Sequence, residues 1–538
     1  MSGYPRPSSV AAVPLRDLPA LSGVSVRDPS GQIVPLADLD QSVTGASMDS
    51  STVQPGDLYM AVPGSQRHGA EFTTTAVAAG AVAVLTDQAG AELIVAQPAL
   101  SRALPILVVD QPRAVLGEVA SAIYGYPTSR LPVIGITGTA GKTSTAYLIE
   151  SALRAAGHVT CMIGTVETRF ADVVVDSVRT TPEAPDVHAL FAAALERGTA
   201  MESGRDMVAV MEVSSHALAF ERVGGVRFAV GGFSNFGLDH LDFHADVDDY
   251  FAAKAKLFDG RCRVEVLNYD DPAVRRLVQP GRITFSALGD PAATWRAEDV
   301  QHFGGADQRG PVDGADQRRP FAQQFTAIGP RGLRLKAGVG LPGRHNVANA
   351  LLALACLVEV GVDPETAAMG VAACRGVPGR LELVDAPGPV LGVVDYAHKP
   401  DAIVAALAAL REVGTGRVIT VIGAGGNRDR GKRPFMGEAA ARGSDIVVIT
   451  DDNPRHEDPA LIRTEVRRGA EAAGASELFE IAGRHQAITE AVRLAKPGDV
   501  VAALGKGHER GQDVAGVVAA FDDRVELAAA LTRRFGGP

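Results

Sequence analysis

The sequence predicts an α/β fold in which helices cover mostly parallel sheets. An apolar, β-branched run at residues 133–136 ends in a glycine-rich turn, and helical periodicity follows that turn. Beyond residue 378, apolar runs at residues 390–395, 418–422, 446–450 and 500–504 alternate with helical segments. Strands that alternate with helices form parallel sheets. The chain has 538 residues, which exceeds one ordinary core and predicts about three domains.

The composition excludes several classes of protein. Apolar residues make up 46% of the chain and charged residues 21%, which is typical of a globular protein and not of a disordered one. The net charge of -11 argues against nucleic acid as the main partner, because phosphate backbones require a basic surface. No apolar run is long enough to span a membrane, and the N-terminus lacks the pattern of a signal peptide. The four cysteines have neither metal-site nor redox spacing, so we expect buried thiols in a reducing cytoplasm.

The first domain is expected over residues 1–130. Residues 1–20 read as a loose tail. A helix end near residues 76–79 is closed by Gly80, and strand-like runs follow it at residues 82–85 and 104–109. This pattern predicts a small α/β unit.

The second domain, over residues 131–377, opens with the sequence GTAGKT at residues 138–143. Glycines let backbone N–H groups approach phosphate oxygens, Lys142 neutralises phosphate charge and the Thr143 hydroxyl can ligate Mg²⁺. The common phosphate-binding pattern has a glycine where this chain has Ile136. A chance match in a chain with 59 glycines is the alternative, but the preceding strand pattern and the following helix pattern disfavour it. The motif therefore predicts a nucleoside triphosphate site.

Further polar groups follow apolar strands of the second domain. Strand-like runs occupy residues 207–213 and 228–230, and helical periodicity over residues 347–360 stops at Gly361. Glu212 stands near a strand end, where a parallel sheet with a phosphate loop forms its ligand crevice. The sequence therefore predicts a magnesium ligand at Glu212, in preference to an ordinary surface glutamate.

The sequence DHLDFH at residues 239–244 holds two histidines and two aspartates within six residues. This spacing fits either a metal site or a polar loop, and the residues alone do not decide between them. Lys254 follows within a helical segment, and composition gives no reason to single it out.

The third domain, over residues 378–538, carries polar motifs on four loops. They are DYAH at residues 395–398, GAGGNRD at 423–429, DNPR at 452–455 and GKGHE at 505–509. Several follow strand ends, where α/β proteins bind ligands, although each alone could be a solvated turn. Arginines on such loops suit the recognition of carboxylates by paired hydrogen bonds.

A short polar repeat lies within the second domain. The sequence GADQR occurs at residues 305–309 and again at residues 314–318. It is too short to be a structural repeat, so we expect an exposed loop without a catalytic role.

Taken in order, these motifs resemble those of the Mur ligases, the ATP-dependent amide-forming enzymes of peptidoglycan synthesis. The resemblance runs from about residue 49 to residue 509 and includes EVSSH at residues 212–216 and GRHNVANA at 343–350. It implies a three-domain architecture with a central P-loop ATPase-like domain and a C-terminal Rossmann-like domain. Within the family the chain is most similar to the MurE branch, and its DNPR sequence resembles the signature of members that add meso-diaminopimelate.

The resemblance implies a reaction and a set of residues for ATP and Mg²⁺. ATP would phosphorylate the D-glutamate side chain of UDP-N-acetylmuramoyl-L-alanyl-D-glutamate, and the diaminopimelate amine would attack the resulting acyl phosphate. The implied catalytic residues are Lys142, His240 and Lys254, with Lys254 carbamylated. The implied magnesium ligands are Thr143, Glu212, His240 and Lys254. The implied ATP-binding residues are Gly138, Thr139, Gly141, Lys142, Thr143, Asn346, Asn349, Arg380 and Asp395.

The resemblance also implies two substrate sites. Thr180, Thr181, Ser214 and Arg222 would contact the nucleotide-sugar peptide, with Ser50 near its uridine end. Arg428, Asp452, Asn453, Arg455, Gly505 and Glu509 would bind the amino acid. The chemistry agrees, because diaminopimelate differs from lysine by a second carboxylate that Arg455 can pair. We expect a monomer.

Two departures concern the uridine end of that site. The family motif Asp-Ser-Arg reads Asp49-Ser50-Ser51 here, and a usual Asp-Gly pair reads His68-Gly69. The alternatives are a lysine-adding or folylpolyglutamate synthetase-like ligase, or a nucleotide-binding protein that has lost catalysis. The DNPR sequence and the N-terminal segment disfavour a folylpolyglutamate synthetase, and intact Lys142, Glu212, His240 and Lys254 disfavour an inactive protein.

Overall fold

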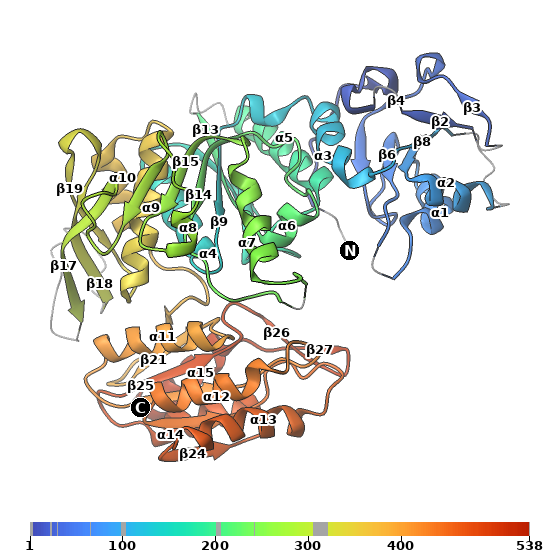
Figure 1. Ribbon diagram of the computed structural model, residues 1–538. Coiled ribbons are helices and arrows are strands. Elements are labelled where there is room, and N and C mark those ends of the chain that lie inside the picture. Colours follow the sequence, from blue (N-terminus) through green and yellow to red (C-terminus); the bar gives the residue numbers. More distant parts are fainter. Residues whose placement is uncertain are drawn as a thin grey trace.

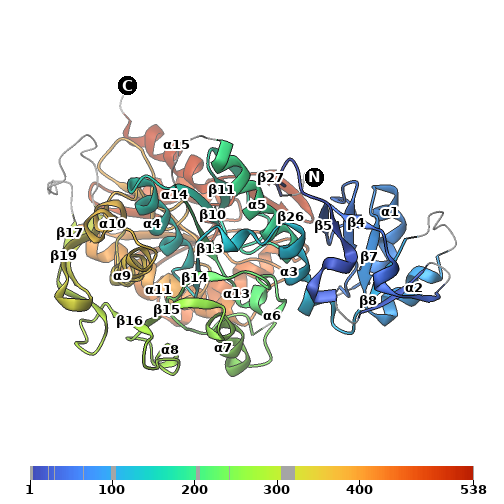
Figure 2. The same ribbon diagram turned by 90° about the horizontal axis from the view of Figure 1, so that it is seen from above.

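The computed structural model describes residues 4–21, 24–28, 31–64, 66–97, 104–200, 206–241, 243–304 and 321–536. These residues form three lobes in chain order (Figures 1 and 2). The GADQR repeat lies outside the described residues. In the view of Figure 1, the C-terminal lobe lies below the central lobe and the N-terminal lobe lies to its side.

The N-terminal lobe is built on a six-stranded sheet among the described residues. Its strands, in spatial order, are β3 (Ile33–Val34), β2 (Ser25–Arg27), β8 (Ile106–Val108), β7 (Ala83–Thr86), β6 (Asp57–Met60) and β5 (Gly45–Ser47). Strands β5 to β8 are parallel, whereas β2 is antiparallel to both of its neighbours. The helices of this lobe are α1 (Thr73–Ala78), α2 (Gln88–Val95) and α3 (Pro112–Ile123). The predicted small α/β unit is confirmed.

The prediction of a loose tail over residues 1–20 is wrong for its described part. Strand β1 (Val13–Pro14) pairs with β4 (Ser42–Val43), and Leu15 and Leu18 are buried in the core. The Arg6 guanidinium donates to Asp57 on β6 at 2.7 and 2.8 Å. Prolines and serines made this segment look unstructured, but its leucines fill the edge of the first core.

The central lobe contains a sheet that has eleven strands among the described residues. Their spatial order is β12 (Val173–Asp176), β11 (Glu167–Phe170), β10 (Val159–Ile163), β13 (Met207–Glu212), β9 (Val133–Thr137), β14 (Phe228–Phe233), β15 (Cys262–Asn268), β16 (Ile283–Ser286), β17 (Trp295–Gly304), β18 (Phe321–Ile328) and β19 (Arg334–Val339). The strands from β10 to β17 in this order are parallel. The two ends of the sheet are antiparallel, which the sequence did not predict.

Helices cover both faces of the parallel part of this sheet. One apolar core joins it to α4 (Lys142–Ala155), α9 (Arg344–Glu359) and α10 (Pro364–Ala372). A second core joins the opposite face to α5 (Ala184–Ala200), α6 (Ser215–Ala219) and α7 (Val247–Ala255). Strands buried on both faces are apolar throughout, and β9, β10 and β13 are fully buried. Their polar chemistry is therefore confined to the strand ends.

The C-terminal lobe is a doubly covered parallel sheet. Its order is β20 (Glu382–Leu383), β21 (Leu391–Asp395), β25 (Val500–Leu504), β22 (Val418–Ile422), β23 (Ile446–Ile449) and β24 (Glu477–Glu480). Only the short β20 is antiparallel among these described strands. Helices α11 (Pro400–Val413), α12 (Lys432–Gly443) and α13 (Pro459–Ala472) cover one face. Helices α14 (Arg484–Leu494) and α15 (Asp523–Phe535) cover the other.

The four strands predicted beyond residue 378 are confirmed as β21, β22, β23 and β25. Because they are parallel and adjacent, the four polar loops that follow them lie along one edge of the sheet. A hairpin of β26 (Gly511–Val514) and β27 (Val517–Ala520) follows the last loop. The domain limits at residues 130 and 377 remain predictions.

Candidate active site at the carboxyl edges of two sheets

The phosphate-type loop lies between two strand ends that also carry polar groups. Strand β9 runs between β13 and β14, so the loop at residues 138–141 is flanked by Glu212 and by Ser234-Asn235. The Ala140 N–H donates to Asn235 Oδ1 at 3.0 Å, and Ser234 Oγ donates to the Ala140 carbonyl at 2.6 Å. These contacts fix the loop from the side of β14.

Two glycines of the loop are required by its geometry. Gly138 has a φ of 148°, and a Cβ there would lie 1.9 Å from Ser234 Oγ. Gly141 has a φ of 82°, and a Cβ there would lie 2.4 Å from Asn349 Oδ1. Both the positive φ and the lack of space exclude other side chains. The second contact also places Asn349 of α9 directly beside the loop.

Two lysines converge on one carbonyl of this loop. Lys142 Nζ donates to the Gly138 carbonyl at 2.8 Å, and Lys254 Nζ donates to the same oxygen at 2.9 Å. Burial lowers the pKa of Lys142 to about 8, and nearby Glu212 only partly offsets this. Burial, and then the charge of Lys142, lower the pKa of Lys254 well below its ordinary value. The loop therefore holds two lysine amines where a phosphate would bring negative charge.

Glu212 is buried and held by oxygen and nitrogen donors. Its Oε2 accepts from Thr143 Oγ1 at 3.0 Å and from Thr165 Oγ1 at 2.9 Å, and its Oε1 accepts from the Thr165 N–H at 2.7 Å. A carboxylate beside a threonine hydroxyl is a donor set that suits Mg²⁺. The described residues hold no cluster of three or more His, Cys, Asp or Glu side chains in metal-binding arrangement. Mg²⁺ needs no such cluster, because one or two carboxylates and substrate phosphates commonly suffice.

His240 lies on the loop between β14 and α7 in a strained conformation, with a φ of 52°. Its Nε2 lies 3.1 Å from Asp239 Oδ2, and its ring packs edge-on against His216 with centroids 4.7 Å apart. Burial lowers the pKa of His240 to about 4. A neutral imidazole is the form that can coordinate a metal. Asp242, also on this loop, lies outside the described residues.

Contacts from the C-terminal lobe reach this site. Arg380 Nη2 lies 3.5 Å from Thr143 Oγ1, and its guanidinium stacks over the Tyr396 ring at 4.7 Å. Lys399 forms an ion pair with Asp239. The loops after β9 and β21 therefore face each other across the two lobes.

The remaining predicted ATP-binding residues are held by both backbone and side-chain groups. Asn346 Nδ2 donates to the Pro342 carbonyl at 2.7 Å and its Oδ1 accepts from Asn349 at 2.9 Å. Asp395 accepts from the N–H groups of Leu381 and Ala397 at 2.6 and 2.7 Å. Thr139 Oγ1 lies 3.1 Å from the Tyr250 hydroxyl of α7.

The predicted nucleotide-sugar residues form a second group beside Glu212. Thr181 Oγ1 donates to the Glu212 carbonyl at 2.8 Å and accepts from the Ser214 N–H at 3.2 Å. Thr180 Oγ1 lies 3.1 Å from Thr165 Oγ1, so it joins the hydroxyl network of the Glu212 carboxylate. Arg222 pairs with Glu183 at 2.9 Å. Ser50 lies in the N-terminal lobe between β5 and β6.

The predicted amino-acid residues lie on the loops of the C-terminal sheet. Arg455 Nη1 donates to the Gly426 carbonyl at 2.7 Å, which joins the loops after β22 and β23. Asn453 Nδ2 donates to Glu509 Oε2 at 2.7 Å, which joins the loops after β23 and β25. Gly505 has a φ of 113°, and a Cβ there would lie 2.5 Å from Asp452 Oδ2. Arg428 is exposed on the loop after β22.

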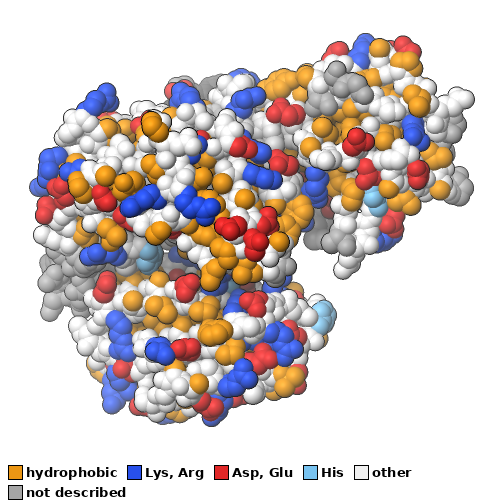
Figure 3. All heavy atoms as spheres, in the orientation of Figure 1, with side chains coloured by type: hydrophobic (Ala, Val, Ile, Leu, Met, Phe, Trp, Pro, Cys, Tyr) orange, Lys and Arg blue, Asp and Glu red, His pale blue; other side chains and the backbone are white. Residues whose placement is uncertain are grey.

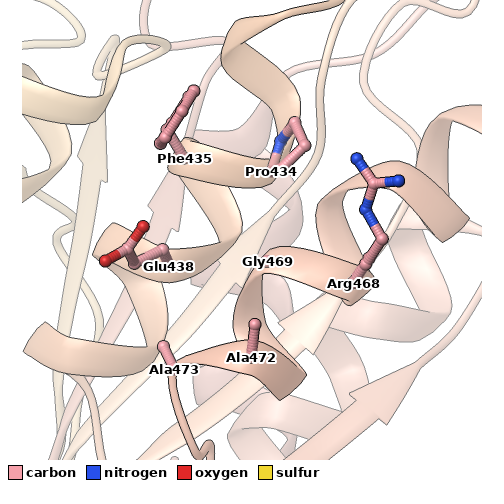
Figure 4. Close-up of a pocket in the computed structure, with 7 residues that line it drawn as sticks. All are labelled: Pro434, Phe435, Glu438, Arg468, Gly469, Ala472 and Ala473. Atoms are coloured by element: carbon pink, nitrogen blue, oxygen red, sulfur yellow. The ribbon is translucent and has the colours of Figure 1, made fainter.

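A pocket of about 340 Å³ lies elsewhere, on the outer face of α12 and α13 (Figure 4). Pro434, Phe435, Glu438, Arg468, Gly469, Ala472 and Ala473 line it. None of these belongs to the loops above, so the pocket is not the chemical site. Figure 3 shows a notch between the N-terminal and C-terminal lobes.

Models of the family match most of the chain. The model described as "Mur ligase family, catalytic domain" matches residues 42–124, "Mur ligase middle domain" matches residues 136–357, and "Mur ligase, glutamate ligase domain" matches residues 379–507. The chain belongs to the Mur ligase family. Mur ligases are ATP-dependent and use Mg²⁺, and the oxygen donors around Glu212 fit that ion.

Relatives match the chain over nearly its whole length. A protein of Streptomyces avermitilis, named UDP-N-acetylmuramoyl-L-alanyl-D-glutamate--2,6-diaminopimelate ligase, is 48% identical, with 99% of both chains covered. A protein of the same name from Corynebacterium glutamicum is 44% identical, with 92% of this chain and 93% of the relative covered. A solved structure of a ligase of that name is 28% identical, with a TM-score of 0.60 over 92% of this chain and 97% of the other. The predicted family and three-domain α/β architecture are thus confirmed.

Sequence reasoning missed several residues of the site. Thr165 binds Glu212, Lys399 crosses from the C-terminal lobe, and the fully buried Lys506 donates to Asn453 and Glu509 at 3.1 and 3.0 Å. Two fully buried arginines, Arg433 and Arg484, support the C-terminal loops. Thr165 follows the end of β10, so the strand-end argument could have found it. The arginines carried no sequence signal, because helix arginines are usually solvated.

Proposed function

We propose that this chain adds meso-diaminopimelate to UDP-N-acetylmuramoyl-L-alanyl-D-glutamate in peptidoglycan biosynthesis, with ATP as the energy source. One observation carries the choice of amino acid: Arg455 is fixed beside Gly426 on the edge of the C-terminal sheet, with Arg428 on the neighbouring loop. Two cations suit an amino acid with a second carboxylate. The names of the relatives support the same substrate pair.

The reaction that we propose first activates the D-glutamate carboxylate by phosphoryl transfer from ATP. The diaminopimelate amine then attacks the acyl carbon of the mixed anhydride, the new C–N bond forms and inorganic phosphate leaves. A free carboxylate is a poor acyl donor, so activation supplies the leaving group. Catalysis of this kind rests on positioning and charge neutralisation, and bound Mg²⁺ would offset the phosphate charge.

The roles of the chain's own residues follow from their places. Lys142 and Arg380 would neutralise phosphate oxygens, because both reach the loop that begins α4. Thr143 and Glu212 would hold Mg²⁺, and His240 would serve a second ion. Thr180, Thr181, Ser214 and Arg222 would hold the nucleotide-sugar peptide near the phosphate loop. Asn453, Glu509 and Gly505 would orient the amino end of diaminopimelate toward that centre.

We also propose that Lys254 is carbamylated and that the carbamate is an anionic ligand of the metal site. The ammonium first loses one proton, and the neutral amine then adds to CO₂ with loss of a second proton, so a cation is replaced by an anion. The lowered pKa of buried Lys254 supports this, because only the neutral amine reacts with CO₂. Its position 2.9 Å from the Gly138 carbonyl also supports it, because that distance brings the carbamate to the phosphate loop.

We propose that the protein acts as a monomer in the cytoplasm. Its cysteines are free thiols, which suits a reducing compartment. Among the described residues, no helix is both long and apolar enough to cross a membrane.

A substrate panel tests the proposed function. Phosphate release from ATP is measured with UDP-muramoyl dipeptide and with meso-diaminopimelate, L-lysine or L-ornithine as acceptor. We expect turnover that requires both substrates and is fastest with diaminopimelate. Equal turnover with L-lysine contradicts the assigned amino acid, and phosphate release that ignores the dipeptide contradicts the assigned ligase.

A further inference from the structure

Arg433, at the start of α12, is fully buried although nothing in the proposed reaction uses it. Its Nη2 donates to the Gly425 carbonyl at 3.1 Å and to both carboxylate oxygens of Glu457 at 3.0 Å. Its Nη1 donates to Glu465 of α13 at 2.7 Å. Gly425 belongs to the loop after β22 and Glu457 to the loop after β23, so one guanidinium joins both loops.

Glu457 extends this connection to the backbone beside the ligand-facing arginines. It accepts a short hydrogen bond from the Asn427 N–H, and the Asn427 side chain accepts from the His456 N–H at 3.1 Å. Asn427 and Arg455 both have positive φ, 50° and 52°. Residues other than glycine rarely adopt a positive φ, so this backbone conformation persists only where surrounding contacts hold it. Asn427 precedes Arg428, and these contacts therefore hold the backbone beside Arg428 against the loop that carries Arg455.

The anchor under Arg433 is rigid because α12 and α13 pack closely. A Cβ on Gly469 would lie 1.7 Å from the Pro434 carbonyl, and a Cβ on Gly437 would lie 1.9 Å from the Val466 carbonyl. Figure 4 shows Pro434 and Gly469 on the two helices that approach. Because neither helix can shift easily, Arg433 and Glu465 have a fixed separation.

The opposite side of the loop after β23 has its own anchor. Arg484 is fully buried in an ion pair with Asp523, and its Nη2 donates to the Leu504 carbonyl at 3.0 Å. Its Nη1 lies 3.4 Å from the Asp451 carbonyl. This holds the loops after β23 and β25 together independently of Arg433. Arg455 keeps its own support, because its N–H donates to the Asp513 carbonyl at 3.0 Å and its carbonyl accepts from the Ala515 N–H at 2.6 Å. Weakening the Arg433 contacts therefore frees the loop that carries Arg428 and leaves Arg455 and the Glu509 side in place.

We infer that Arg433, acting through Glu457, is a positioning residue that sets the spacing of Arg428 and Arg455 and so selects an amino acid with a second carboxylate. This inference rests on the proposed function, because it assigns those two arginines to the amino-acid site. Arg433 itself touches no substrate in this assignment.

The test compares Arg433→Lys, Glu457→Gln, the double variant and a control, Arg417→Lys. Lysine keeps the buried charge but cannot hold Gly425 and both glutamates at once. The control is matched in its contacts, because Arg417 pairs with Asp499 at 2.8 Å and donates to a carbonyl at 2.9 Å at the other edge of the same sheet. Arg417 is 30% exposed and Arg433 fully buried, so thermal unfolding separates any loss of stability from a change in KM. Steady-state kinetics with each substrate varied are measured together with thermal unfolding.

For Arg433→Lys we expect KM for diaminopimelate to rise about tenfold, as for the loss of a charge-assisted hydrogen bond. The kcat/KM preference for diaminopimelate over L-lysine should fall by a similar factor. KM for ATP and for the UDP-dipeptide should stay unchanged, and Arg417→Lys should match the wild type in every KM. The double variant should be no worse than Arg433→Lys alone, because both changes break one connection.

An unchanged KM and an unchanged preference in Arg433→Lys would overturn the inference. So would a double variant in which the rise in KM is the product of the rises in the two single variants. Glu457→Gln gives the same test if Arg433→Lys does not fold. The wild-type substrate panel separates the two claims. If the wild type prefers L-lysine, the proposed function fails, and the positioning inference is judged by KM for the amino acid that the wild type uses.

Discussion

The phosphate loop and the amino-acid loops both lie at the carboxyl edges of parallel sheets, but they are supported in different ways. In the central lobe, the functional groups bind each other: Lys142 and Lys254 share the Gly138 carbonyl, and Glu212 binds Thr143. In the C-terminal lobe, buried ion pairs of Arg433 and Arg484 hold the loops from beneath.

The difference teaches how each site meets its ligand. In the proposed site, a nucleotide would replace the internal hydrogen bonds of Lys142 and Lys254, so each lysine would change partners on binding. The amino-acid loops keep their anchors, so Arg455 can meet its ligand with little rearrangement. Substitutions in the first region should therefore affect chemistry, and those in the second should affect recognition.

The largest effect is expected for Lys142→Met. Removing the cation that faces the phosphates should reduce kcat for phosphate release by about 10³-fold, the scale found for a lost electrostatic contact in a closed site. The control is Lys256→Met, because Lys256 is 44% exposed in a surface ion pair. A loss of less than tenfold would show that Lys142 is not the principal phosphate cation.

A smaller loss is expected for Lys254→Ala. If the carbamate holds the metal site, kcat should fall by about 10²-fold, and short carboxylic acids added to the assay should restore part of it. Lys256→Ala should show neither effect. Full activity in Lys254→Ala refutes the role of Lys254, whereas loss without rescue argues against the carbamate alone.

Substitution in the C-terminal lobe should change recognition and not the chemical step. Arg455→Met should raise KM for diaminopimelate by about 10- to 100-fold, the range expected for lost hydrogen bonds to a charged group. Its kcat/KM for L-lysine should not fall, because lysine lacks the second carboxylate. Arg468→Met, on the outer pocket of the same lobe, is the control. An equal loss for both amino acids would mean that Arg455 shapes the loop and does not read the carboxylate.

The smallest effects concern pH, and in both regions stability rises with pH, but over different pH ranges. The pKa of Glu457 lies below its ordinary 4.5, because the Asn427 N–H and Arg433 donate to it. Its stabilisation is therefore present above pH 4.5 and is lost as pH falls below that value. Burial lowers the pKa of Lys142 from 10.5 to about 8. The charged lysine therefore destabilises the nucleotide-free protein fully below pH 8, and this destabilisation declines as the pH rises to 10.5.

Hydrogen exchange of individual peptides measures both effects in one protein. Protection of residues 452–458 should fall in acid, and Glu457→Gln should flatten that change. Protection of residues 137–147 without nucleotide should rise between pH 8 and pH 10.5, and Lys142→Met should flatten that rise. If the protection of both peptides changed over the same pH range, the separate support of the two sites would be contradicted.

Motifs and strand patterns predicted much of this molecule because they are local. Strand β9, the glycine turn and α4 follow one another, and the four C-terminal loops each follow an apolar strand. The leucines of residues 15–18 were missed because they fill a core made by distant strands. The antiparallel ends of the central sheet were missed because pairing is decided between segments far apart in the chain.

The sequence alone determined the family, the α/β class, the phosphate loop and the order of its polar motifs, because each depends on neighbouring residues. Only the tertiary structure decided that Lys142 and Lys254 share one carbonyl, that Thr165 supports Glu212 and that Arg433 joins two loops. Those contacts join residues from about 50 to more than 100 positions apart or lie inside a packed core. Their geometry comes from how strands and helices pack, which local sequence does not encode.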